Sequence, residues 1–120
     1  MPNSMVRSFG HSCNGLRIAW REDHSFRNAT IQCVTAMVIA TALYGVGYIG
    51  IFYWLILVGT VVSILVVETI NTAIEAVTDK ASPERHPLAK KAKDIGSAAV
   101  LLTRLYAVVC WAVVLIHQAG

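Results

Sequence analysis

Charge is what this sequence has least of. Only 14% of its 120 residues are Asp, Glu, Lys or Arg, whereas 56% are hydrophobic. A soluble globular protein carries about 25% charged residues because its surface must be wetted, and a disordered chain would be poor in apolar residues. The net charge of +3 is too small to suggest nucleic-acid binding. The length suits one domain, so the composition predicts a small integral membrane protein.

Other features are also missing. The three cysteines, Cys13, Cys33 and Cys110, contain no C-x-x-C pair, so neither a disulfide framework nor a zinc site is expected, and we predict that they are packing residues. The first apolar run begins near residue 30 behind a polar segment, which does not fit a signal peptide. There is no Walker A motif. Residues 45–50 do spell G-x-G-x-x-G, but their apolar helical flanks predict a turn rather than a dinucleotide-binding loop.

The distribution of the few charges predicts membrane-spanning helices. Residues 28–67 contain no charged side chain, and residues 95–120 contain only Arg104. A span needs about 20 apolar residues, so the first stretch is long enough for two spans joined by the glycine-rich turn. We predict three spans, at about 28–44, 49–67 and 96–117. No Pro or Gly follows the second span up to residue 79, so its helix is expected to continue to that position.

The segment at about 4–25 is predicted to be an amphipathic surface helix. Five of its apolar residues recur at spacings of three and four and share one face: Met5, Phe9, Cys13, Leu16 and Trp20. Arginines on the neighbouring face suit a helix that lies in the headgroup plane. Gly15 and its polar neighbours lower the helix propensity and predict a break there. This pattern fits a plain membrane anchor as well as a part of a catalytic site.

Basic residues precede the first predicted span and lie between the second and the third, whereas the glycine-rich turn and the C-terminus carry none. By the positive-inside rule, the N-terminus is expected in the cytoplasm and the C-terminus outside it.

Polar side chains form a stripe at the cytoplasmic end of the second span. Glu68, Asn71, Glu75 and Asp79 are spaced three, four and four residues apart, so they share one narrow face of a helix. A solvated face would explain Asp79 well but Glu68 poorly, because a carboxylate that faces lipid costs several kcal/mol. The stripe therefore predicts a functional site.

The segment that follows the stripe is rich in charge, with eight charged residues among residues 79–94. Lys93 and Asp94 lie where the third span enters the membrane, level with the stripe. Carboxylates that hold a divalent metal, opposite a lysine that neutralises phosphate, are the groups that phosphoryl transfer needs. A membrane lipid kinase is the leading hypothesis. The alternative from another class is a small transporter or channel subunit in which Glu68 and Asn71 line a path, with Arg104 as its one supporting feature.

Two segments carry a family resemblance: ETINTAIEAVTD at residues 68–79 and AKDIGSAAV at residues 92–100. They resemble the two conserved blocks of the prokaryotic diacylglycerol kinase family, and residues 15–20 and 26–27 are similar to its N-terminal region. The resemblance implies a homotrimer of three-span subunits with shared active sites, in the bacterial inner membrane. It also implies transfer of the γ-phosphate of ATP, with Mg²⁺, to diacylglycerol, which gives phosphatidic acid. An undecaprenol kinase remains the alternative, although the layout is closer to the diacylglycerol branch.

The resemblance also implies residue roles. Glu68 would be the general base, and Glu75 and Asp23 would bind the metal, with Glu22 as a substitute because Asp23 stands where the family has a longer glutamate. The remaining residues expected around the nucleotide are Arg17, Asn71, Glu84, His86, Lys93 and Asp94. Arg104 departs from the family, which is apolar there. The length of its side chain favours snorkelling to the interface, and pairing with a carboxylate of its own or a neighbouring subunit is the alternative.

Overall fold

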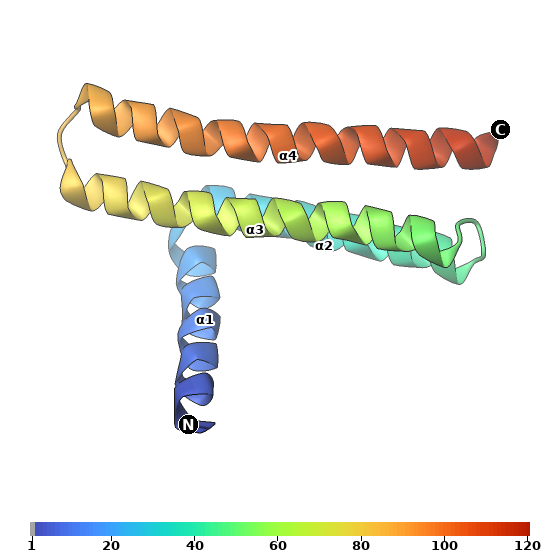
Figure 1. The fold of residues 1–120 in the computed structure, drawn as a ribbon, viewed down its shortest axis with the longest axis horizontal. Helices are drawn as coiled ribbons and strands as arrows, with labels where there is room; N and C mark the ends of the chain where they lie inside the picture. Colours follow the sequence, from blue (N-terminus) through green and yellow to red (C-terminus); the bar gives the residue numbers. More distant parts are fainter. Residues whose placement is uncertain (1) are drawn as a thin grey trace.

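The structure is a computed structural model that describes residues 2–120, and these residues form four helices (Figure 1). They are α1 (Pro2–Glu22), α2 (His24–Gly45), α3 (Ile51–Ala81) and α4 (Pro87–Ala119). Within residues 2–120, α2, α3 and α4 are long and apolar enough to cross a membrane. Three spanning helices were predicted, and this number is confirmed.

The corner between α1 and α2 lies at Asp23. Helix α1 runs without interruption through Gly15, so the predicted break at that glycine is wrong. One glycine costs a helix only about 1 kcal/mol, which does not outweigh the good helix formers around it. The chain turns instead where Asp23 Oδ1 accepts a hydrogen bond from Phe26 N (2.8 Å) and caps α2. Arg27 completes the corner, since it donates to the backbone oxygens of Trp20 (2.9 Å) and Arg21 (3.0 Å).

The glycine-rich segment at residues 45–50 is a turn between two helices, as predicted. Gly47 has a φ of +79°, a left-handed conformation that glycine adopts without a steric penalty. Tyr48 N donates to Leu43 O (2.9 Å) and closes the turn. Gln118 near the C-terminus donates to Tyr48 O (2.6 Å), so the end of α4 lies beside this turn.

Helix α3 is the central helix, because α2 and α4 both pack against it. The α3–α4 pair is antiparallel, and Trp111 of α4 donates its indole N–H to the buried Thr60 of α3 (3.1 Å). A core cluster near the glycine-rich turn contains Leu57 and Val114.

The three cysteines differ in exposure: Cys33 is buried and Cys110 half-buried, but Cys13 is exposed. The predicted packing role is therefore wrong for Cys13, which lies on the open face of α1.

The spanning helices differ in length, and this positions the site. Helix α2 has 22 residues, or about 33 Å at 1.5 Å per residue. Helices α3 and α4, with 31 and 33 residues, reach about 46–50 Å. They extend past the start of α2 at the end where α1 leaves the bundle (Figure 1). The hydrocarbon core of a bilayer is about 30 Å thick, so the excess length carries the α3–α4 loop beyond it.

Candidate functional site

The site is built from the last four turns of α3 and the facing part of α4. Helix α3 carries the stripe Glu68, Asn71, Glu75 and Asp79, and it continues to Ala81 with no break at the predicted membrane boundary. Helix α4 begins at Pro87 and is capped by His86, whose Nδ1 accepts from Leu88 N (3.1 Å). The helix is continuous from this cap into the third span, so its charged first turns and its apolar part form one rigid element.

Glu68 is the deepest carboxylate of the stripe and is held by an arginine. Only 6% of the Glu68 side chain is exposed, and its Oε1 accepts from Arg104 Nη2 (3.2 Å). Arg104 Nη1 donates to Gln32 Oε1 on α2 (2.9 Å). The favoured interpretation that Arg104 snorkels to the interface is therefore wrong, and the alternative of pairing with a carboxylate of its own subunit is what the structure has. A buried carboxylate needs an opposite charge, and Arg104 is the cation within its reach.

The middle of the stripe contacts Gly96 of α4. Asn71 Nδ2 donates to Glu75 Oε1 (3.2 Å). Asn71 Oδ1 is buried, and no group among residues 2–120 donates a hydrogen bond to it. A Cβ added at Gly96 would lie 2.2 Å from this oxygen, so the two helices approach here more closely than any other residue would allow. Asn71 thus orients Glu75 on one side and touches the backbone of α4 on the other.

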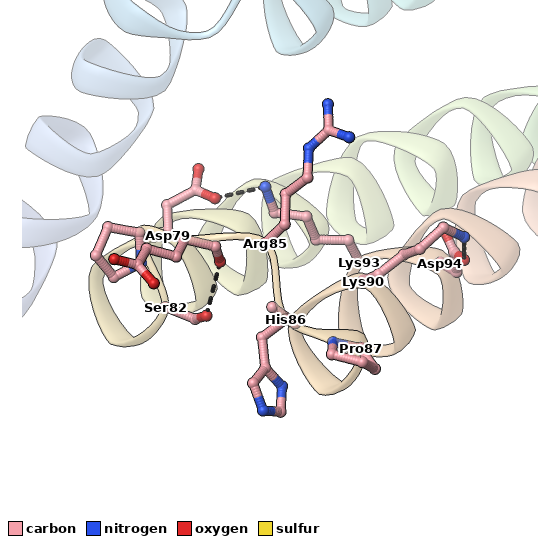
Figure 2. A pocket seen from close by; sticks show the side chains of 11 residues that line it. Asp79, Ser82, Arg85, His86, Pro87, Lys90, Lys93 and Asp94 are labelled. Carbon is pink, nitrogen blue, oxygen red and sulfur yellow. Dashed lines mark hydrogen bonds and ion pairs between the residues drawn. The ribbon is translucent and has the colours of Figure 1, made fainter.

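The α3–α4 loop encloses an open cavity of about 700 Å³, which we call the loop pocket (Figure 2). Charges of both signs line it: Asp79, Glu84, Arg85, Lys90, Lys93 and Asp94. Lys93 forms an ion pair with Asp79 across the two helices, and the hydrogen bond within it raises the pKa of Lys93. Lys90 and Asp94 pair along α4 (2.6 Å), and this hydrogen bond raises the pKa of Lys90. The imidazole of His86 points away from the Asp79–Lys93 pair.

Of the residues predicted from the sequence, Glu84, His86, Lys93 and Asp94 are brought together in the loop pocket. Glu68, Asn71 and Glu75 lie deeper along the same face of α3.

The other predicted residues lie on or beside α1. Asp23 caps α2 through one carboxylate oxygen, while Glu22 and Arg17 are exposed. Residues 2–120 contain no group of three or more His, Cys, Asp or Glu side chains that could hold a metal ion. Gln32 is a functional candidate that the sequence did not suggest. The signal that could have revealed it is its long polar side chain within the uncharged stretch of residues 28–67.

Comparison with known proteins identifies the relatives of this chain. A family model described as prokaryotic diacylglycerol kinase matches residues 10–115. The protein named diacylglycerol kinase of Escherichia coli strain K12 is 37% identical over 116 residues, which covers 97% of this chain and 92% of the relative. The protein of the same name from Helicobacter pylori strain 26695 is 35% identical over 107 residues, covering 89% of this chain and 80% of the relative. That of Pseudomonas aeruginosa strain PAO1 is 33% identical over 112 residues, covering 93% and 88%. The resemblance of residues 68–79 and 92–100 is thereby confirmed, and the chain belongs to the prokaryotic diacylglycerol kinase family.

Proposed function

We propose that this protein transfers the γ-phosphoryl group of ATP to the hydroxyl group of diacylglycerol, giving phosphatidic acid and ADP. The reaction serves phospholipid metabolism at the cytoplasmic face of the bacterial inner membrane. The observation that carries the proposal is the family match over residues 10–115, together with relatives that are named diacylglycerol kinase. The arrangement of charge along α3 and α4 supports it.

The stripe on α3 spans the depth over which lipid and nucleotide would meet. Glu68 and Asp79 are 11 residues apart, or about 16 Å along the helix axis. Glu68 therefore lies toward the membrane, where the hydroxyl of a lipid is found, and Asp79 lies at the loop pocket, which is open to water. In the transfer, the lipid oxygen bonds to the γ-phosphorus and the bond from that phosphorus to the β–γ bridging oxygen of ATP breaks. The proton of the lipid hydroxyl goes to Glu68, and ADP leaves.

Glu75 lies between these two levels and suits a magnesium ion. Mg²⁺ prefers oxygen ligands and is commonly held by one or two carboxylates together with substrate phosphates. Glu75 is half-buried and receives one hydrogen bond from Asn71, so its carboxylate is oriented and keeps further lone pairs available. The bound ion would neutralise charge on the β- and γ-phosphates. Asp23, with Glu22 as the alternative, is proposed as the second carboxylate.

The loop pocket is proposed as the nucleotide site. Its volume of about 700 Å³ lies within the usual range of small-molecule pockets, about 300–1,000 Å³. Lys93 would exchange its bond to Asp79 for one to the γ-phosphate. Further contacts to the nucleotide are assigned to the remaining candidates: Arg17, Asn71, Glu84, His86 and Asp94.

Orientation and assembly are proposed on charge and exposure. The basic residues of α1 and of the α3–α4 loop lie at one end of the bundle, and the glycine-rich turn and the C-terminus lie at the other (Figure 1). The positive-inside rule then places the N-terminus in the cytoplasm and the C-terminus in the periplasm. Met5, Phe9 and Leu16 on α1 are exposed in the single chain, which suits a surface helix in the headgroup plane. A homotrimer with shared sites would cover apolar faces of α2–α4 that one chain leaves open.

The test is phosphate transfer from radiolabelled ATP by the purified protein in detergent micelles with Mg²⁺. Diacylglycerol and undecaprenol are offered separately, and we expect label in phosphatidic acid. Label in undecaprenol alone would transfer the assignment to the alternative kinase, and label in neither lipid would refute both. Glu68→Gln is expected to abolish turnover while ATP binding, measured by equilibrium dialysis, remains. The transporter alternative, with Glu68 and Asn71 lining a path, had Arg104 as its one supporting feature, and the Arg104 guanidinium is hydrogen-bonded to Glu68 and Gln32.

A further inference from the structure

Arg104 is the point where three spanning helices meet through side chains. Its guanidinium, on α4, donates to Glu68 of α3 (3.2 Å) and to Gln32 of α2 (2.9 Å). The two bonds use different nitrogens, Nη2 and Nη1, so the planar group is fixed in orientation as well as in position.

The two side chains of the Glu68–Arg104 ion pair differ in exposure. The Glu68 side chain is 6% exposed, whereas that of Arg104 is 37% exposed. The arginine therefore covers the carboxylate on one side, and its contact is to Oε1 alone. Oε2 of Glu68 receives no hydrogen bond from residues that the structure describes and is the oxygen left to accept a proton.

Because the Glu68 side chain is buried, its position depends on its ion pair with Arg104. A single charge within the membrane is costly and needs a partner, and replacing one member of a buried pair leaves the other uncompensated. Without Arg104, the Glu68 side chain would have neither its partner charge nor a fixed rotamer. A base that is displaced by about 1 Å can lose a hundredfold in rate, so the guanidinium is placed to affect the chemical step more than substrate binding.

We propose that Arg104 is a positioning residue for phosphoryl transfer, which holds Glu68 through Oε1 and is itself oriented by Gln32. The inference rests on the proposed function, in which Glu68 accepts the proton of the lipid hydroxyl. Arg104 contacts no reacting atom in this scheme, and its effect passes through Glu68.

The experiment measures kcat and the KM for ATP in diacylglycerol micelles for four variants. Arg104→Met should lower kcat by about 10- to 100-fold, with the KM for ATP within about twofold of the wild type because the nucleotide site is separate. Arg104→Lys keeps the charge and should recover part of the loss. Gln32→Leu should lower kcat by less than Arg104→Met, and Gln32→Glu, which keeps an acceptor for Nη1, should retain more activity than Gln32→Leu.

Two controls separate positioning from folding. Leu105→Met changes the neighbouring, exposed residue of α4 and should leave kcat and KM unchanged. Arg104→Met should bind ATP as the wild type does in equilibrium dialysis, which a misfolded variant would not.

The outcomes are distinct. A kcat for Arg104→Met equal to that of the wild type, or a parallel loss of kcat and ATP binding, would overturn the positioning role while leaving the kinase intact. Full turnover by Glu68→Gln would overturn the assignment of the base, and with it the role of Arg104. A wild-type protein that phosphorylates neither lipid would overturn the proposed function itself.

Discussion

Replacing Gly96 with alanine tests the closest approach between α3 and α4. The new Cβ would lie 2.2 Å from Asn71 Oδ1, so either the amide must rotate or the helices must separate. Overpacking of this kind costs about 1–3 kcal/mol, and loss of the Asn71–Glu75 hydrogen bond adds about 0.5–1.5 kcal/mol. Alanine recovers about 1 kcal/mol of helix propensity. We therefore expect a net loss of about 0.5–3.5 kcal/mol in the free energy of unfolding.

The assay is unfolding by SDS in mixed micelles, followed by circular dichroism, with the Mg²⁺ dependence of turnover measured on the same samples. Gly96→Ala should unfold at lower SDS and need more Mg²⁺, because displacement of Asn71 releases Glu75. Gly10→Ala is the matched control, since no heavy atom lies within 4 Å of its added Cβ, and it should be neutral or stabilising. A Gly96→Ala protein as stable as the wild type, with an unchanged Mg²⁺ requirement, would refute the close approach and the orienting role of Asn71 together.

Three further outcomes follow from single contacts. Trp111→Phe keeps an aromatic side chain, though a smaller one, and removes the hydrogen bond to buried Thr60 (3.1 Å). The free energy of unfolding, measured by SDS titration, should fall by at least about 0.5–1.5 kcal/mol, and no change would mean that the bond is not formed in the membrane. The hydrogen bond to Asp79 raises the pKa of Lys93 above its ordinary 10.5, so Lys93 keeps its charge up to that value and loses it, and the ion pair with it, as the pH rises through the raised pKa. ¹⁵N NMR titration should show the pKa of Lys93 falling in Asp79→Asn, and an unchanged pKa would contradict the pair. Asp23→Ala should cost about 1 kcal/mol of stability by loss of the helix cap, whereas Asp23→Asn should keep the cap. Both variants should raise the Mg²⁺ requirement of turnover, and an unchanged requirement in both would remove Asp23 from the metal site.

The stripe on α3 shows how far local pattern extends. Glu68, Asn71 and Glu75 share a face because a helix has 3.6 residues per turn, and no knowledge of the neighbouring helices is needed to see it. The partners of these residues follow no such rule. Gly96 touches Asn71 and Arg104 binds Glu68 only because of the register in which α4 packs on α3.

Helix α1 shows where a local sequence pattern fails to predict the structure. Its glycines predicted a break at Gly15, but the helix ends at Glu22, where Asp23 begins the next helix and Arg27 reaches back to the carbonyls of Trp20 and Arg21. Several weak local preferences compete in such a segment, and the contacts between two helices decide among them. The three spans were predictable because their signal, an apolar stretch of about 20 residues with at most one charged side chain, has no local competitor.

The sequence by itself determined that this protein has three helices long and apolar enough to cross a membrane, where its charges gather and which face of α3 carries the acidic stripe. Each of these depends on composition or helical periodicity within one segment. The tertiary structure alone decided that Arg104 pairs with Glu68 rather than reaching for the interface, that Gln32 completes the pair, and that Gly96 touches Asn71. These contacts join residues 25 to 72 positions apart, and they exist because a buried charge takes whichever partner the packing of the helices brings within reach.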